Sequence, residues 1–193
     1  MAGPRGVMWA VVAHLQSRAR GRVVLFFMAV SALLGGVVLP AGSARLRALS
    51  GGVGPLDVRP FYTPAQAYAA LAAYGEAGRA TYRTGALTAD MAFPLAYALF
   101  LSLAVAWLCR RAGDPDVACG WPLYLVPLVA GALDVMENVS VAAMLWRYPK
   151  FSPALAWVAA AFTAMKWVAV ALSLGALAVA AWRAAKAAWA SLH

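Results

Sequence analysis

Residues 23–44 read VVLFFMAVSALLGGVVLPAGSA, a run of 22 residues that contains no charged side chain. A helix needs about 20 mostly apolar residues to cross a bilayer, so this run predicts a membrane-spanning helix. The composition agrees, because 64% of the 193 residues are hydrophobic and only 12% are charged, whereas soluble domains contain about 25% charged residues. The sequence therefore predicts an integral membrane protein, with no room for a separate soluble catalytic domain.

Three further stretches are apolar enough to cross a membrane. They are residues 88–109, 120–146 and 153–182, which together contain four charged side chains. Each is long enough for one crossing with some tilt, and none is long enough for two. With residues 23–43 as the first span, we expect an all-α fold: a bundle of four transmembrane helices that forms a single domain over residues 1–193.

Residues 1–22 form a basic leader before the first span. A basic start, an apolar stretch and the small residues Gly42-Ser43-Ala44 are also typical of a cleaved signal peptide. The apolar stretch exceeds the usual signal-peptide core of about 7 to 15 residues, so we favour an uncleaved anchor and keep cleavage as the alternative. Within the leader, the apolar residues 7–15 include Trp9 and are typical of a short helix in the membrane interface.

Residues 45–85, between the first two spans, are too many for a simple turn. A helix start is visible in them: Thr63 can cap, Pro64 suits the first helical position, and Gln66 completes a capping box. We expect one extra amphipathic helix from there to about Thr84. Its shared face would consist of residues at three- and four-residue steps, namely Tyr68, Leu71, Gly75, Gly78 and Tyr82. This face should pack on the bundle, since its glycines allow close approach.

The lysines and arginines set the expected orientation. With the N-terminus in the cytosol, the cytosolic side has eight of them, Arg5, Arg18, Arg20, Arg22, Arg110, Arg111, Arg183 and Lys186. The other side has seven, Arg45, Arg47, Arg59, Arg79, Arg83, Arg147 and Lys150. The arginines just before the first span decide the orientation, so we expect both termini in the cytosol. A bacterial plasma membrane is the default location. The cysteines, Cys109 and Cys119, then flank a cytosolic loop and should be reduced, with a disulfide as the alternative.

The net charge of +9 suits anionic membrane headgroups. Nucleic-acid binding is excluded, because the basic residues are scattered at segment ends and are not interleaved with aromatic residues. The expected partners are membrane lipids and a lipid-like small molecule, and self-association stays open. No metal site is expected, because the only histidines, His14 and His193, lie near the chain ends. The sequence indicates no cofactor.

The charged side chains within predicted spans mark the candidate site, since each costs at least about 2.5 to 3.5 kcal/mol in a bilayer. Asp134, Glu137 and Asn138 are spaced i, i+3 and i+4, so they project from one side of the third span, toward protein. Asp134 and Lys166 each lie 16 residues from the turn near Lys150. An antiparallel hairpin places them at one depth and predicts an ion pair. For Glu137 we expect no partner within this hairpin.

The other candidate residues come from neighbouring segments. Asp90 enters from the outer end of the second span, and Arg79, Arg83 and Tyr82 lie on the loop helix above it. We expect a polar pocket that opens outward. Its catalytic residues would be Glu137, Asp134 and Asp90, and its ligand-binding residues Asn138, Lys166, Arg79, Arg83 and Tyr82.

Two or three carboxylates around one lysine exceed the needs of an ion pair and suit acid–base chemistry or a proton relay. The leading hypothesis is a membrane-embedded enzyme or binding protein for a lipid or isoprenoid-like ligand. One alternative is a structural or assembly protein whose ion pair pins helices together. Another is a subunit of a proton-coupled transporter. Nucleophile-elbow, phosphate-loop and zinc motifs are absent from the sequence.

Overall fold

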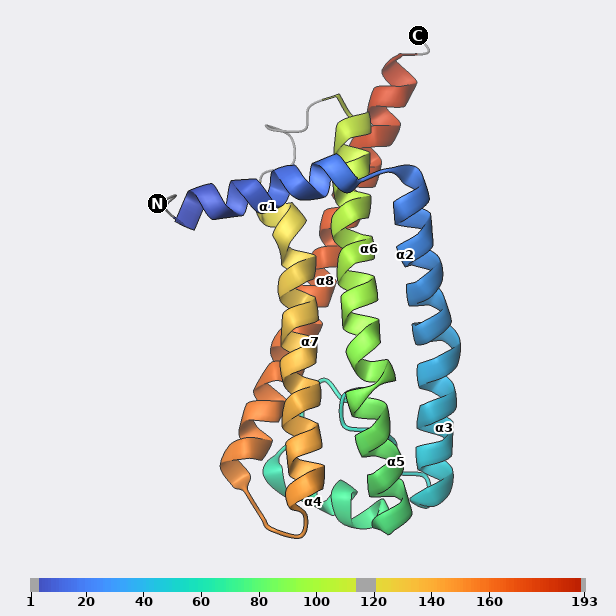
Figure 1. Ribbon diagram of the computed structural model, residues 1–193, viewed down its shortest axis with the longest axis vertical. Helices are drawn as coiled ribbons and strands as arrows, with labels where there is room; N and C mark the ends of the chain where they lie inside the picture. The colour runs from blue at the N-terminus through green and yellow to red at the C-terminus, as the bar shows by residue number, and fades with distance from the viewer. Residues whose placement is uncertain (1–3, 114–120, 192–193) are drawn as a thin grey trace. The chain divides into compact units, whose positions relative to one another are not determined.

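The computed structural model describes residues 4–113 and 121–191 (Figure 1). It is all-helical, with 85% helix and no strand in those residues, as the sequence predicts. The helices are α1 (Pro4–Arg18), α2 (Gly21–Leu33), the π-helical segment η1 (Leu34–Val38), α3 (Leu39–Leu49), α4 (Pro64–Ala73), α5 (Gly75–Leu87), α6 (Ala89–Arg111), α7 (Trp121–Arg147) and α8 (Pro153–Ala190).

Four helical segments are long and apolar enough to cross a membrane. They are Gly21–Leu49, Gly75–Arg111, Pro122–Arg147 and Pro153–Ala190, and each contains most of one span expected from the sequence. The chain divides into two compact units. The first comprises Met1–Val30, Ala96–Ala130 and Val168–His193, and the second comprises Ser31–Leu95 and Gly131–Trp167. A single domain over the whole chain stays a prediction.

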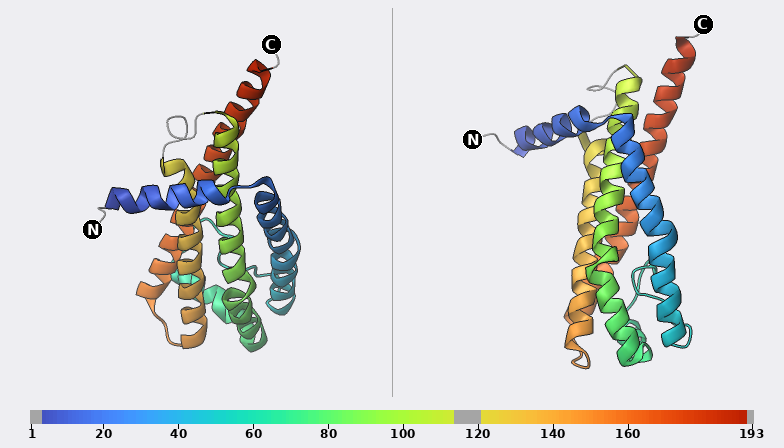
Figure 2. Two further views of the ribbon diagram at one scale, coloured as in Figure 1. Left: turned by 45° about the horizontal axis from the view of Figure 1, so that its top comes forward. Right: turned by 45° about the vertical axis from the view of Figure 1, so that its right-hand side comes forward.

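In the first unit, α1 is a helix, as the apolar leader predicts, and in Figure 1 and the left view of Figure 2 its C-terminal end overlaps α6 short of the upper end of that helix. Val12 and Leu15 of α1 are buried in this unit's core, whereas Trp9 is exposed. The side chain of Gln16 donates to the Tyr124 hydroxyl at 3.5 Å. The buried side chains therefore fix one face of α1 against protein and leave the other face exposed.

Cys109 of the first unit is buried and disulfide-bonded. The expectation of reduced thiols is therefore wrong for Cys109, while Cys119 lies outside the described residues.

In the second unit, the capping box at the start of α4 is confirmed. The Thr63 hydroxyl accepts from the Gln66 backbone N–H at 3.3 Å, and the Gln66 side chain accepts from the Thr63 backbone N–H at 2.8 Å. The expectation of one continuous helix to about Thr84 is wrong, because α4 ends at Ala73 and α5 begins at Gly75. Gly75 has φ 62°, a left-handed conformation that glycine adopts without steric cost and that interrupts the helix.

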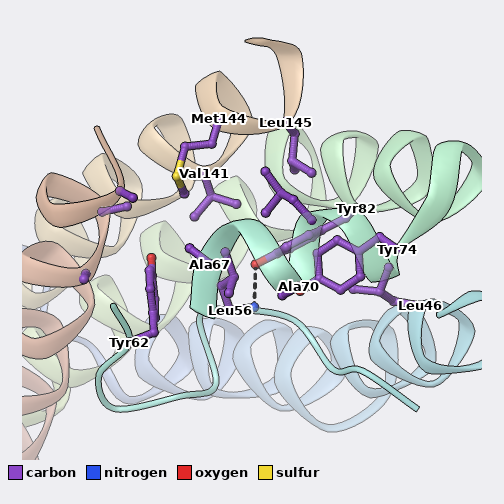
Figure 3. Close-up of a cluster of buried hydrophobic side chains, with 14 residues drawn as sticks. Leu46, Leu56, Tyr62, Ala67, Ala70, Tyr74, Tyr82, Val141, Met144 and Leu145 are labelled. Carbon is purple, nitrogen blue, oxygen red and sulfur yellow. Dashed lines mark hydrogen bonds between the residues drawn. The ribbon is translucent and has the colours of Figure 1, made fainter. Parts of the chain in front are cut away.

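Burial of aromatic side chains holds α4 and α5 in this unit. Figure 3 shows Tyr74 and Tyr82 with Leu46, Leu56, Val141 and Met144 in one apolar cluster. The Tyr74 and Tyr82 rings meet edge to face with centroids 5.6 Å apart, a favourable geometry for aromatic pairs. The α4–α5 segment therefore belongs to the core of this unit and is more than a surface connection.

Candidate functional site

The site is centred on Lys166 of α8, in the second unit. Its Nζ lies 3.2 Å from Oδ1 of Asp134 on α7, which confirms the predicted ion pair. Both residues are buried, with exposed fractions of 5% and 8%. The residue spacing about the α7–α8 turn was therefore sufficient to identify this pair.

Lys166 also contacts the Glu137 carboxylate, through Oε2. The expectation that Glu137 has no partner in the hairpin is therefore wrong. Asp134 and Glu137 are separated by roughly 5 Å along α7, and the long, flexible lysine side chain reaches both. Two carboxylates thus share one ammonium group, and Glu137 is fully buried, with an exposed fraction of 0%.

The second oxygen of Glu137 is bound by a residue that the sequence analysis did not identify. The Thr163 hydroxyl lies 2.5 Å from Glu137 Oε1 and 3.5 Å from the hydroxyl of Tyr62. Thr163 precedes Lys166 by three residues, so both project from one face of α8. A continuous row of polar groups results: Tyr62, Thr163, Glu137, Lys166 and Asp134.

Burial raises the pKa of Tyr62 above its ordinary value of 10.0. The Thr163 hydrogen bond opposes this effect and the nearby carboxylates of Glu137 and Asp57 reinforce it. Burial also raises the pKa of Tyr74. Tyr62 therefore keeps its proton at neutral pH, and its hydroxyl can donate to or accept from Thr163.

Asn138 ties α7 to the start of α6. Its side-chain N–H donates to the backbone carbonyl of Asp90 at 2.5 Å, and Asn138 is buried. The structure thus brings Asn138, one turn from Asp134 on α7, into contact with the backbone of Asp90. A shared role of these residues in one site stays a prediction.

The three expected rim residues lie in different surroundings: Tyr82 is buried, whereas Arg79 and Arg83 stack on aromatic rings. The buried Tyr82 hydroxyl accepts from the Leu56 backbone N–H at 3.0 Å and donates to Asp57 Oδ1 at 3.1 Å. Arg79 donates to the Leu71 carbonyl at 3.0 Å. The two guanidinium groups stack on aromatic rings, with Arg79 4.1 Å from the Tyr148 centroid and Arg83 5.5 Å from that of Trp146. Within residues 4–113 and 121–191, neither arginine forms an ion pair with a carboxylate.

Asp57 is a further acidic residue of this site that sequence reasoning missed. It is half-buried, its carboxylate accepts from the Tyr82 hydroxyl, and its backbone carbonyl accepts from the indole N–H of Trp167, the neighbour of Lys166. The described residues contain no group of three or more histidine, cysteine, aspartate or glutamate side chains that could hold a metal ion. The cation that the structure places among these carboxylates is the Lys166 ammonium.

Comparison with protein-family models, curated proteins and solved structures finds no match for this chain. The charges of the cluster are informative: if Asp134, Glu137 and Lys166 were all ionised, the buried group would carry one net negative charge. A net charge in a low-dielectric interior is costly, and one additional proton removes it. The arrangement is thus suited to hold a proton and to exchange it.

Proposed function

We propose that this chain is a multi-pass plasma-membrane protein that performs acid–base chemistry on a lipid or isoprenoid-like molecule. In this proposal four spanning helices form a bundle, and the α4–α5 segment packs at the outer end of α6. The observation that supports the proposal most is the sharing of Lys166 by two buried carboxylates, Asp134 and Glu137.

Each residue of the cluster has a distinct role in this proposal. Glu137 exchanges the proton, because Thr163 and Tyr62 extend a row of hydroxyl groups from its Oε1 atom. Asp134 and Lys166 hold the compensating charges in place. General acid–base catalysis requires a carboxyl group that can be in either protonation state near neutral pH, and a surplus of carboxylates over ammonium groups favours that condition.

A lipid-like ligand fits the surroundings of the cluster. The cluster is buried between helices that are apolar enough to span a membrane, and in this proposal an apolar molecule reaches it from the bilayer. Arg79 and Arg83 are the proposed ligands of an anionic headgroup, because a guanidinium group stacked on a ring keeps N–H donors at its edge. Asp90, Asn138 and Tyr82 would complete the polar side of the site.

Native mass spectrometry of the protein, released from the membrane with its surrounding lipid, tests this proposal. We expect the wild type to retain a distinct molecule that Glu137→Gln loses. The matched control is Ser140→Ala, which removes a buried hydroxyl on the same helix that binds only the helix carbonyl of Met136, at 2.7 Å. The proposal would be contradicted if Glu137→Gln retained the same molecule. It would also be contradicted if the wild type, Glu137→Gln and Ser140→Ala all retained no distinct molecule.

A second candidate function is structural, in which the cluster pins α7 to α8. The complete burial of Glu137 and its contacts with both Lys166 and Thr163 favour it. This candidate predicts that the triple variant Asp134→Leu, Glu137→Met, Lys166→Met is at least as stable as the wild type, since apolar residues of similar volume often replace buried ion pairs without loss. It also predicts that this variant keeps the cellular function. Loss of function in a stable triple variant would exclude a purely structural role.

A further inference from the structure

The connection between α3 and α4, residues 50–62, is exposed in part, but two of its large side chains are fully buried. Connections between helices normally run over the surface, because their backbone polar groups need partners. Here Leu56 and Tyr62 both have an exposed fraction of 0%. In Figure 3 both side chains point into the apolar cluster, and a dashed line joins the Leu56 backbone nitrogen to the Tyr82 hydroxyl. Leu56 and Tyr62 are therefore part of the core.

The connection also reaches far along α8. The indole N–H of Trp167 donates to the Asp57 backbone carbonyl at 3.3 Å. Trp167 lies 14 residues beyond Pro153, the first residue of α8, which corresponds to roughly 21 Å along the helix. The hydrocarbon core of a bilayer is about 30 Å thick. With α8 crossing the bilayer from near its start, Asp57 lies deep within the membrane layer.

We propose that residues 50–62 form a re-entrant loop that brings water to the Lys166 cluster, and that Asp57 is the residue at which this water meets the cluster. The inference deepens the proposed function, on whose membrane placement it rests, by naming the route through which protons reach Glu137 and Lys166.

Side chains outside the loop form hydrogen bonds with the backbone groups of its inner part. Non-helical backbone at membrane depth is tolerated only where protein buries it or where it lines a water-filled cavity. The Tyr74 hydroxyl donates to the Gly54 carbonyl at 2.9 Å, Tyr82 accepts from Leu56, and Trp167 donates to Asp57. Three aromatic side chains from α5, α8 and the α4–α5 junction thus replace the missing backbone partners on the protein side.

The outer part of the loop requires water. Val58 is 50% exposed, and its neighbours Asp57 and Arg59 are half-exposed and carry charges. Charged side chains beside irregular backbone are not stable against hydrocarbon. The Asp57 backbone carbonyl accepts from Trp167, and the ring centroid of Trp167 lies 5.8 Å from the Lys166 Nζ, so water at this surface lies close to the buried cluster.

Cysteine accessibility distinguishes water from lipid at this surface. Val58→Cys tests the loop, and Met165→Cys is the matched control, because Met165 is 46% exposed on α8 close to Lys166. A charged methanethiosulfonate reagent is supplied to both faces of membrane vesicles, with the unmodified chain as the background for Cys109 and Cys119. We expect Val58→Cys to react at least about ten-fold faster than Met165→Cys, since the reagent and the thiolate are both excluded from hydrocarbon. Equal, slow rates at the two positions would overturn the proposal.

A second pair of variants tests the role of Asp57. Asp57→Cys should react as fast as Val58→Cys, and Arg59→Cys replaces it if the aspartate variant does not fold. If Asp57→Cys and Arg59→Cys were both protected from the reagent while Val58→Cys reacted, water would stop short of the cluster. That result would overturn the role assigned to Asp57. Glu137→Gln should leave the rate at Val58→Cys unchanged, so failure of the water route and failure of the proposed chemistry are distinguishable.

Discussion

The ammonium group of Lys166 contacts the carboxylate of Glu137 as well as that of Asp134. A pair with one acid and one base would have no net charge. The additional carboxylate of Glu137 therefore turns a helix-pinning ion pair into a group with a proton to exchange. The chemistry proposed for this protein depends on that second contact.

Removal of Lys166 should be strongly destabilising. Lys166→Met leaves two buried carboxylates without a counter-charge, and breaking a buried ion pair from one side costs about 3 to 5 kcal/mol. Denaturant unfolding in mild detergent measures this change, with Met165→Ala as the control at the adjacent, exposed position. An unfolding free energy equal to that of the wild type would mean that the carboxylates are not held by Lys166.

Thr163→Val should be destabilising by a smaller amount. The substitution keeps the shape of the side chain but leaves Glu137 Oε1 without the hydroxyl that lies 2.5 Å away. An unsatisfied buried acceptor costs about 1 to 3 kcal/mol. The more distant Tyr62 hydroxyl, 3.5 Å from Thr163, should matter less, so Tyr62→Phe should have a smaller effect. The opposite order in unfolding experiments would argue against the row of hydroxyl groups.

Stability should fall at alkaline pH. Burial raises the pKa of Tyr62 and Tyr74 above 10.0 in the folded protein. Their contribution to stability is fully present below the unfolded-state pKa and is lost as pH rises above it, because only the unfolded state then releases the protons. Unfolding free energies measured from pH 8 to pH 11 should decline above about pH 10, and Tyr62→Phe should make the decline shallower. A profile that stays flat in the wild type would contradict the burial of these hydroxyls.

The break between α4 and α5 gives a separate prediction. Gly75 has φ 62° with open space around it, so Gly75→Ala should destabilise the protein through backbone strain alone, by about 1 to 2 kcal/mol. Gly36→Ala is the control, because Gly36 is helical and also has open space; there alanine should be neutral or stabilising. A stabilising Gly75→Ala would support the single continuous helix that the sequence suggested.

The orientation of the chain also needs a direct test. The arginines before the first span predict that both termini lie in the cytosol. We propose the cytosolic orientation, in which Lys150→Cys, in the exposed turn between α7 and α8, reacts with an impermeant reagent added to intact cells. Reaction only after permeabilisation would show the reverse orientation.

The sequence predicted those parts of the fold that depend on local patterns. Long apolar runs identified the four helical segments, and the i, i+3, i+4 spacing placed Asp134, Glu137 and Asn138 on one face of α7. The same periodicity applied to α8 could have revealed Thr163, since it lies one turn from Lys166. These signals suffice because side-chain direction in a helix follows from residue number.

The remaining parts could not be predicted because they depend on tertiary contacts. Asp57 and Tyr62 lie in a connection without periodicity, whose path depends on hydrogen bonds from Tyr74, Tyr82 and Trp167. Gly75 was ambiguous because glycine permits both a close helix contact and a left-handed turn. The stacking of Arg79 and Arg83 on aromatic rings likewise had no signature in the spacing of the chain.

Infrared spectroscopy of the carboxyl groups tests the central claim most directly. We predict that the wild type in lipid at neutral pH shows the C=O stretch of a protonated carboxylic acid. Both Glu137→Gln and Asp134→Asn should lose it, because either change leaves one acid and one base. Glu76→Gln, at an exposed position, should retain it. Absence of the band in the wild type, or its persistence in both cluster variants, would contradict a shared proton at Lys166.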